Sequence, residues 1–136
     1  MLGRCGLWLG GFVRSRGRSL ACAGSGLRFM VRSQGNARCH AAATAGAVVL
    51  GAMAQLSAAQ WCWIIGAIGA VWCAEAMNTA LELLCDYACV PPARHELIRH
   101  AKDVAAGAVL CAALTSASVG ACVLGPAVIG LCRRVL

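Results

Sequence analysis

The chain has 136 residues, of which 60% are hydrophobic and 12% are charged, and its formal net charge is +7. Soluble domains carry about 25% charged residues, so this composition and a mean hydropathy of +0.74 argue against a soluble protein. Apolar runs of about 20 residues indicate an integral membrane protein, and the length allows one small domain. We therefore predict an all-α membrane protein.

Residues 1–40 are rich in arginine, glycine and serine. A secretory signal fits poorly because the apolar piece at 7–13 is short and contains glycine. A transit peptide fits the composition better, but we favour a segment that lies at the membrane surface. We predict a basic arm over residues 1–23, with disorder expected for residues 1–12. An amphipathic surface helix is predicted over residues 24–38, where Leu27 and Met30 lie beside arginines.

Three membrane-spanning helices are predicted, over residues 41–56, 61–84 and 104–131. Residues 57–60 form an uncharged loop in this scheme, and tryptophans at 61 and 63 anchor the second span at the interface. Pro91-Pro92 stops the second helix, so residues 87–103 are predicted as a polar loop. Pro126 kinks or ends the third span. The lipid-embedded domain would then cover residues 24–132.

Basic residues set the expected orientation. Seven arginines precede position 40 without an acidic residue among them, and all five acidic residues lie between positions 75 and 103. A basic arm also occurs in nucleic-acid-binding proteins, but the membrane composition favours the positive-inside rule. We expect a cytoplasmic N-terminus and no nucleic-acid partner.

Ten cysteines raise the question of a disulfide framework or a metal site. No CxxC pair is present, and the closest pair is Cys85 and Cys89. Several cysteines lie inside apolar runs, where cysteine behaves as a small hydrophobic residue. Free thiols are therefore predicted.

The segment at 75–86 puts carboxylates into an otherwise apolar run. On a helix turning about 100° per residue, one arc of roughly 80° collects Glu75, Asn78, Glu82 and Asp86. Ionisable groups at membrane depth cost about 2.5–3.5 kcal/mol each and indicate function. A solvated stripe on a surface helix is the alternative, but the preceding residues 61–74 carry no charge.

This acidic face meets Lys102 and Asp103 at one membrane boundary in the predicted topology. Mg²⁺ binds a few carboxylates and otherwise phosphate oxygens and water, and a lysine at a helix N-terminus holds phosphate. A buried glutamate such as Glu75 suits the role of general base toward a hydroxyl. The absence of GxxxxGKS/T and GxGxxG excludes an ordinary P-loop or protein-kinase site. Phosphate transfer at a membrane surface is predicted, although a proton or ion pathway would use the same carboxylates.

The chain resembles the family of small bacterial membrane kinases that phosphorylate diacylglycerol and undecaprenol. The resemblance covers about residues 24–125 and is carried by these motifs: Glu75-x-x-Asn78-Thr79-Ala80-x-Glu82-x-x-x-Asp86; His95 followed by Ala101-Lys102-Asp103-Val104-Ala105-Ala106-Gly107-Ala108-Val109; Gly26-Leu27-Arg28; and Asn36-x-Arg38-x-His40. It implies three spanning helices, a cytoplasmic N-terminus and a homotrimer with sites shared between subunits.

The resemblance also implies roles for single residues. Glu75 would be the general base that deprotonates the lipid hydroxyl, and Asn78 would help to position that lipid. Glu82 would bind the Mg²⁺ that bridges the ATP phosphates. The rest of the ATP site would comprise Asp86, His95, Lys102 and Asp103, and Ala106 would lie where the lipid passes.

The sequence departs from the family at Gln34, where the family carries a second metal-binding glutamate. A glutamine carbonyl still coordinates Mg²⁺ but brings no charge. The segment between Asp86 and His95 is also about two residues longer than in diacylglycerol-type members. Arg94 replaces the usual aromatic residue, so the resemblance does not extend to the adenine contacts.

The resemblance therefore implies an ATP- and Mg²⁺-dependent lipid kinase of the bacterial inner membrane, which makes phosphatidate from diacylglycerol or undecaprenyl phosphate from undecaprenol. The alternatives are a weakened or non-catalytic membrane homologue, because of Gln34, and a small ion carrier that uses Glu75 and Glu82.

Overall fold

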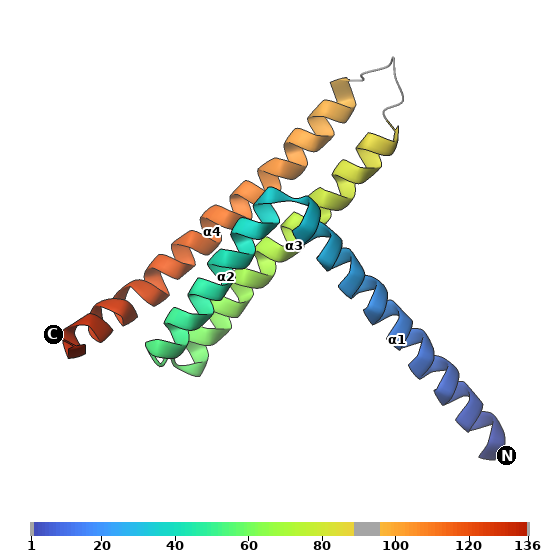
Figure 1. The fold of residues 1–136 in the computed structure, drawn as a ribbon, viewed down its shortest axis with the longest axis horizontal. Helices are drawn as coiled ribbons and strands as arrows, with labels where there is room; N and C mark the ends of the chain where they lie inside the picture. The colour runs from blue at the N-terminus through green and yellow to red at the C-terminus, as the bar shows by residue number, and fades with distance from the viewer. Residues whose placement is uncertain (1, 89–95, 136) are drawn as a thin grey trace.

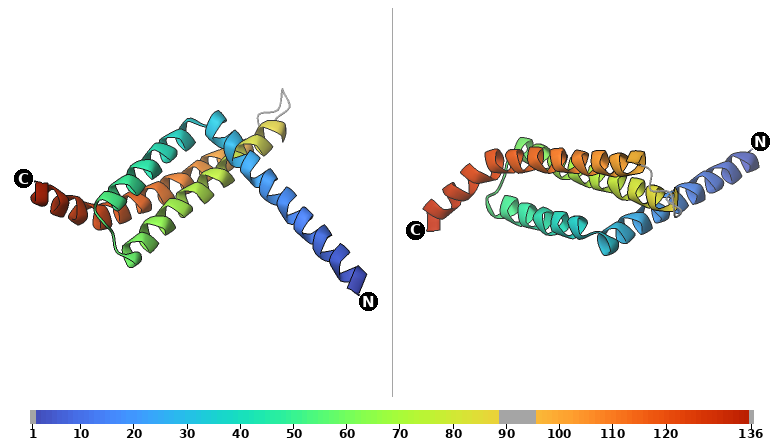
Figure 2. Two further views of the ribbon diagram at one scale, coloured as in Figure 1. Left: turned by 60° about the horizontal axis from the view of Figure 1, so that its bottom comes forward. Right: turned by 90° about the horizontal axis from the view of Figure 1, so that it is seen from above.

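The computed structural model describes residues 2–88 and 96–135, and it describes side chains over residues 15–88 and 96–133. Within these ranges the chain forms four helices, α1 (Leu2–Ser33), α2 (Gly35–Met53), α3 (Ala58–Ala88) and α4 (Glu96–Val135) (Figure 1). The all-α prediction is confirmed. Helices α2, α3 and α4 run antiparallel to their chain neighbours in one bundle, and α1 projects away from it (Figure 2).

The turn between α2 and α3 comes earlier than predicted. Helix α2 ends at Met53, and Gln55 adopts a left-handed backbone conformation with φ of 53°. The Leu56 amide then donates to the Gly51 carbonyl, which closes α2 in a Schellman motif. Helix α3 starts at Ala58, so the prediction of a loop over residues 57–60 was wrong for most of its length.

A capping box explains why α3 starts where it does. The Ser57 hydroxyl accepts from the Gln60 amide at 3.4 Å, and the Gln60 side-chain carbonyl accepts from the Ser57 amide at 2.9 Å. These reciprocal bonds satisfy two amide groups that a helix start would otherwise leave unpaired. The Ser-x-x-Gln spacing that is typical of a capping box is present in the sequence at Ser57 and Gln60.

The predicted polar loop over residues 87–103 was too long. Tyr87 belongs to α3, and α4 already begins at Glu96. Most of residues 96–103 are good helix formers, so they extend α4 beyond its apolar part. The Pro91-Pro92 stop lies outside the described residues. Helix α4 does not end at Pro126 but continues to Val135, and its C-terminal part bends away from the bundle (Figure 2).

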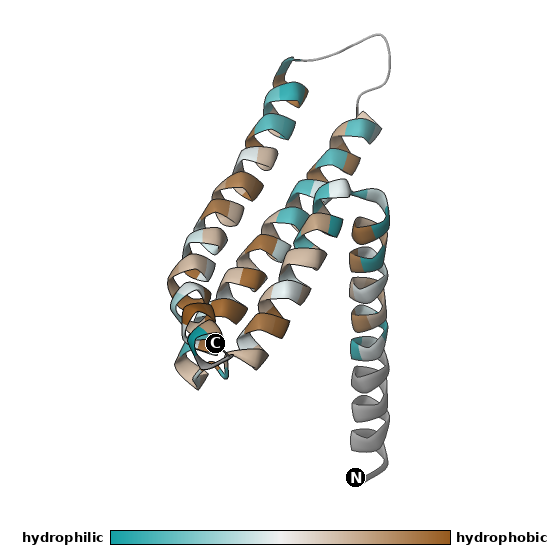
Figure 3. Cartoon of the chain, turned by 60° about the vertical axis from the view of Figure 1, so that its left-hand side comes forward, coloured by the Kyte–Doolittle hydropathy of each residue, from teal (hydrophilic) through white to brown (hydrophobic). Residues whose placement is uncertain are grey.

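Two helices within the described residues are long and apolar enough to cross a membrane, Ala58–Ala88 and Glu96–Arg133. Helix α2 has 19 residues, or about 28 Å of helix, and Arg38 and His40 occupy its first turns. The predicted first span at 41–56 therefore stays a prediction. Hydrophilic residues gather where α3 ends and α4 begins, with apolar residues toward the α2–α3 turn (Figure 3).

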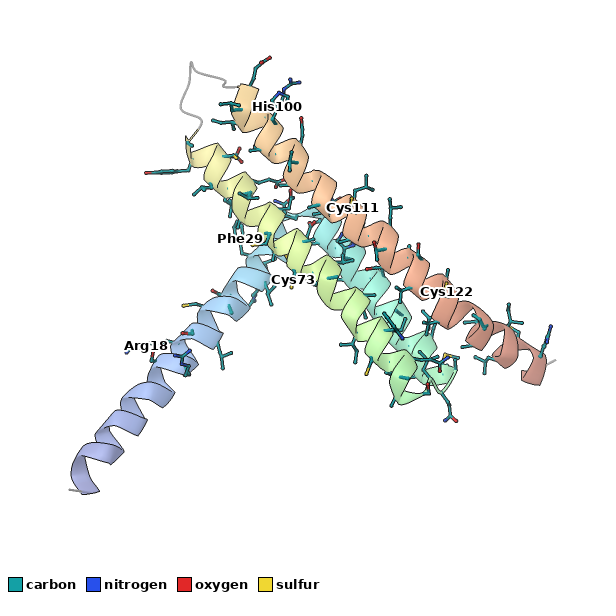
Figure 4. All side chains as sticks on the ribbon, turned by 180° about the vertical axis from the view of Figure 1, so that it is seen from behind. Arg18, Phe29, Cys73, His100, Cys111 and Cys122 are labelled. Atoms are coloured by element: carbon teal, nitrogen blue, oxygen red, sulfur yellow. The ribbon has the colours of Figure 1, made fainter. Side chains whose placement is uncertain are left out.

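Residues 2–33 form one continuous helix, so the predicted basic arm and the predicted surface helix belong to a single element. Met30 anchors its last turns and is 2% exposed, whereas Leu27 and Phe29 are half exposed. The position of α1 on a membrane surface stays a prediction, as does the division of the chain at residue 23. Figure 4 shows Phe29 near the junction of α1 with the bundle.

The cysteines with described side chains are free thiols, in agreement with the prediction. Cys73, Cys111 and Cys122 are exposed on the outer surfaces of α3 and α4 (Figure 4).

Close packing of α2 on α3 gives the first testable prediction. Gly51 is buried, and a Cβ added there would lie 2.9 Å from the Trp61 ring and 3.0 Å from Leu56 Cδ1. We expect Gly51→Ala to lower the free energy of unfolding by about 1–3 kcal/mol through overpacking, measured by thermal unfolding in detergent micelles.

Gly46→Ala is the matched control. A Cβ at Gly46 meets nothing within 4 Å, so alanine should be neutral or stabilising by roughly 0.5–1 kcal/mol. Equal effects of the two substitutions would contradict the packing argument.

Candidate functional site

One face of α3 is buried along most of its length. Its buried residues recur at helical spacing, so that they form a single stripe, and they are Ile64, Val71, Glu75, Asn78 and Thr79. The stripe is apolar near the α2–α3 turn and becomes polar from Glu75 onward. Of the four residues predicted to share a face, Glu75 and Asn78 are buried on this stripe, whereas Glu82 is half-buried and Asp86 is exposed.

Small residues of the other helices are buried at the level of this polar stripe. The hydrogen bonds Gln34–Glu82 and Thr44–Trp72 fix the antiparallel register of α2 against α3, which sets Ala37 opposite Asn78 and Thr79. Ala37 is fully buried, and Ala105 and Val109 of α4 are each 7% exposed. Short side chains at these positions let the three helices approach closely around Glu75.

Gln34, Asn78 and Glu82 form an amide–carboxylate cluster. The Gln34 side-chain amide donates to Glu82 Oε2 at 2.8 Å, and the Asn78 amide donates to Glu82 Oε1 at 3.2 Å. Since a carboxylate only accepts, both amides must present their NH₂ groups to it. The two residues predicted as metal ligands, Gln34 and Glu82, are therefore in direct contact.

Three oxygen atoms beside this cluster are buried and have no hydrogen-bond partner among the described residues. They are Glu75 Oε2, Asn78 Oδ1 and Thr79 Oγ1. Glu75 is 1% exposed, Thr79 4% and Asn78 5%. A buried polar group without a partner costs about 1–3 kcal/mol, so three such groups within two turns of one helix mark a place where water, an ion or a ligand would supply the missing contacts.

Carboxylates become more exposed along α3 toward its C-terminal end. Glu82 is half-buried, and Asp86 is exposed and pairs with Lys102 of α4. This ion pair joins the ends of α3 and α4 at the polar end of the bundle. Asp103 and Ala106 are exposed on α4, and His95 lies outside the described residues.

The donor set at Glu82 suits a weakly held Mg²⁺. Glu82 supplies a carboxylate, and the Gln34 carbonyl and the unpaired Asn78 Oδ1 are further hard oxygen ligands of the kind Mg²⁺ takes. Within the described residues, however, no group of three or more His, Cys, Asp or Glu side chains is placed to hold a metal. An ion held here would therefore need most of its ligands from outside the protein.

Thr79 and His40 occur in the family-like motifs, but neither was predicted to be a site residue. Thr79 follows Glu75 by four positions and so lies on its face, which was the available signal. His40 lines a cavity between α2, α3 and α4 at about the level of Glu75. Its position depends on the register of α2 against α3, which the sequence pattern alone does not fix.

Comparisons with known proteins show which family the chain resembles. The family model described as Prokaryotic diacylglycerol kinase matches residues 21–124. The chain is 34% identical over 109 residues to a Bacillus subtilis protein named Undecaprenol kinase, covering 80% of this chain and 87% of that protein. It is also 34% identical over 113 residues to a Synechocystis protein named Diacylglycerol kinase, covering 83% of this chain and 64% of the relative's length. No solved structure matches the chain.

The unpaired Thr79 hydroxyl gives a second prediction. Thr79→Val keeps the shape of the side chain and removes a buried, unpaired polar atom, so we expect the protein without ligand to gain about 1 kcal/mol of stability. Thermal unfolding in micelles measures the gain.

The control for this prediction is Thr115→Val. The Thr115 hydroxyl is exposed and donates to the Cys111 carbonyl at 2.9 Å, so its loss should bring no gain. A destabilised Thr79→Val protein would mean that the hydroxyl already has a partner.

Proposed function

The chain belongs to the prokaryotic diacylglycerol kinase family, and we propose that it transfers the γ-phosphate of ATP to the primary hydroxyl of a membrane lipid, diacylglycerol or undecaprenol. The observation that carries this proposal is the Glu75 carboxylate, which is 1% exposed and keeps one oxygen unpaired. A buried carboxylate with a free oxygen suits the role of general base toward a lipid hydroxyl.

Glu75 would act as the general base. Its unpaired oxygen accepts the proton of the lipid hydroxyl, the hydroxyl oxygen forms a bond to the γ-phosphorus, and the bond from that phosphorus to the β–γ bridging oxygen breaks to release ADP. Exclusion of water from Glu75 keeps this proton transfer directed to the lipid and limits hydrolysis of ATP. Asn78 and Thr79, with their unpaired oxygens one turn away, orient the hydroxyl.

Lys102 would neutralise phosphate charge. It is paired with Asp86 at the exposed end of α3 and α4, and exposed ion pairs of this kind contribute only about 0–1 kcal/mol. The ammonium can therefore exchange Asp86 for a phosphate oxygen at little cost. Asp103 and His95 complete the ATP site in this proposal.

Mg²⁺ would be held by Glu82 and Gln34. When bound, such an ion offsets the negative charge of the phosphates, which supplies much of the catalysis in phosphoryl transfer. In the protein without the ion, both Glu82 oxygens accept bonds from amides. Because these bonds compete with a metal, the site should require more Mg²⁺ than one built from two glutamates.

The membrane arrangement completes the proposal. Helices α2, α3 and α4 cross the bacterial inner membrane, the N-terminus and the polar end of the bundle face the cytoplasm, and the chain assembles as a homotrimer. Support for the orientation comes from the arginines that precede position 40, by the positive-inside rule, and the homotrimer follows from the family resemblance alone.

A weakened or non-catalytic homologue is the second candidate. The bond from Gln34 to Glu82 favours it, because an amide takes the place that a charged metal ligand would otherwise have. The two candidates differ in whether phosphate transfer can be measured at any Mg²⁺ concentration.

Phosphate transfer from γ-labelled ATP tests the function directly. Purified protein in micelles is offered diacylglycerol and undecaprenol separately across a Mg²⁺ series. We expect transfer to one of the lipids and a loss of at least about 100-fold in Glu75→Gln, because a general base contributes roughly 10²–10⁴-fold. Glu96→Gln, an exposed acid at the start of α4, should behave as wild type. A folded wild-type protein without transfer at any Mg²⁺ concentration would sink the kinase proposal.

Replacing Gln34 tests the metal site. Gln34→Glu adds a second carboxylate beside Glu82, so we expect the half-saturating Mg²⁺ concentration to fall about tenfold or more, measured in the same assay. Gln55→Glu, at the opposite end of α2, controls for the added charge. An unchanged Mg²⁺ requirement would show that residue 34 is not a metal ligand.

A further inference from the structure

The part of α4 that follows Pro126 extends beyond the residues that match the family. The match ends at residue 124, whereas α4 continues to Val135. Pro126 lies inside the helix, where a proline ring removes a backbone hydrogen bond and pushes against the preceding turn. Helices kink at such prolines, and the end of α4 turns away from the bundle (Figure 2). We call residues 127–135 the C-terminal segment.

The length of α4 exceeds what a bilayer requires. At 1.5 Å per residue, its 40 residues make about 60 Å of helix, whereas the hydrocarbon core is about 30 Å thick. Lys102 lies at the polar end of the bundle, where it pairs with Asp86, and residues 104–125 supply about 33 Å from there. In the proposed membrane arrangement, the C-terminal segment therefore starts where α4 leaves the core on the side opposite the site.

The turn between α2 and α3 gives the same depth. Its residues 54–57 are not helical, and lipid-exposed backbone of this kind is excluded from the hydrocarbon core. Trp63, in the second turn of α3, is 67% exposed, as is typical of a tryptophan that anchors a helix at the interface. A pocket of about 340 Å³ lies between the turn and α4, lined by Leu56 on one side and by Pro126 and Gly130 on the other. The C-terminal segment therefore starts in the headgroup region.

The C-terminal segment has one apolar face. On a helix turning about 100° per residue, Val128, Leu131 and Cys132 fall within an arc of about 100°, and Pro126 lies roughly opposite the middle of that arc. Because the proline ring pushes the helix open on its own side, α4 bends toward the apolar face. The bend turns this face back toward the hydrocarbon core and leaves the pocket beside the α2–α3 turn on the side of Pro126.

The surroundings of this face within the chain do not cover it. Its three residues are partly or fully exposed, and the neighbouring Ile129 is 56% exposed. The face is followed by the exposed Arg133 and by a second arginine, and no acidic residue occurs in the sequence after Asp103. An apolar face combined with cationic residues is the pattern of a helix that lies in the membrane interface. At headgroup depth, lipid phosphates match the charge of Arg133.

We propose that the C-terminal segment is an interfacial helix on the leaflet opposite the proposed site, with its apolar face in the hydrocarbon and Arg133 at the phosphates of phospholipids. The inference rests on the membrane arrangement of the proposed function. An arginine drawn into the hydrocarbon core is strongly disfavoured, so the segment stops α4 from sliding toward the cytoplasm. It thereby fixes the depth of Lys102 at the other end of the same helix.

Photocrosslinking tests the inference without relying on kinase activity. Benzoylphenylalanine replaces Cys132 on the apolar face, Cys122 within the span as the positive control, or the exposed Leu97 at the cytoplasmic start of α4 as the negative control. The full chain is irradiated in nanodiscs of phosphatidylglycerol and phosphatidylcholine, and mass spectrometry counts the phospholipid adducts. We expect similar yields at positions 132 and 122, at least about fivefold above position 97.

Two further variants test the parts of the inference, each with the photoreactive residue at position 132. Pro126→Ala removes the kink, and in a straight helix position 132 lies about 9 Å beyond Pro126, so the lipid adduct should fall about threefold or more. Arg133→Glu places an acid beside anionic headgroups and should lower the adduct by a similar factor. An unchanged yield in either variant would overturn the role given to that residue.

The remaining outcomes separate this inference from the proposed function. A crosslink from position 132 to a second copy of the chain would assign the segment to a subunit contact and overturn the inference. A yield at position 132 as low as that at position 97 would place the segment in water and overturn it too. Either result leaves the kinase proposal in place, because the segment lies at the opposite end of the bundle from the Asp86–Lys102 pair. If the wild type transfers no phosphate, lipid adducts at position 132 still support the interfacial helix.

Discussion

The burial of one carboxylate inside an apolar helix is the constraint on which the rest of the structure depends. Glu75 lies on the stripe of α3 that also packs Ile64 and Val71, so the same face must exclude water and hold a polar group. Small residues solve this conflict, because Ala37 and Ala105 bring the neighbouring helices close without filling the space around the carboxylate. The unpaired oxygens at this place lower stability, a cost that proteins usually accept at functional sites.

Glu82 is a second carboxylate of α3 that is partly buried, but both of its oxygens have hydrogen-bond partners. Its carboxylate is held by two neutral amides, from Gln34 and Asn78, which satisfy it without a cation. A glutamate in place of Gln34 would repel Glu82 unless a metal stood between them. Gln34 thus holds the Glu82 carboxylate in place without a metal. In the proposed Mg²⁺ site, this glutamine would bind the ion more weakly than a glutamate would, because it brings no charge.

Part of this arrangement follows from the sequence alone. The spacing of Glu75, Asn78, Glu82 and Asp86 predicted their common face, because a helix repeats every 3.6 residues. Helix ends were harder to predict, since polar residues such as Glu96 extend a helix as readily as they form a loop. Contacts between helices, such as Gln34 with Glu82 and Thr44 with Trp72, depend on the register of two elements far apart in the chain. The cavity beside Val71 depends on that register too.

The junction between α1 and α2 has a mechanical consequence. Gln34 is the single non-helical residue between two helices, and its side chain holds Glu82. Helix α1 has 32 residues, or about 48 Å of helix, and the chain passes from it into α2 through the residue that holds Glu82. A change in the angle between α1 and α2 would therefore act directly on the hydrogen bond that orients the Glu82 carboxylate.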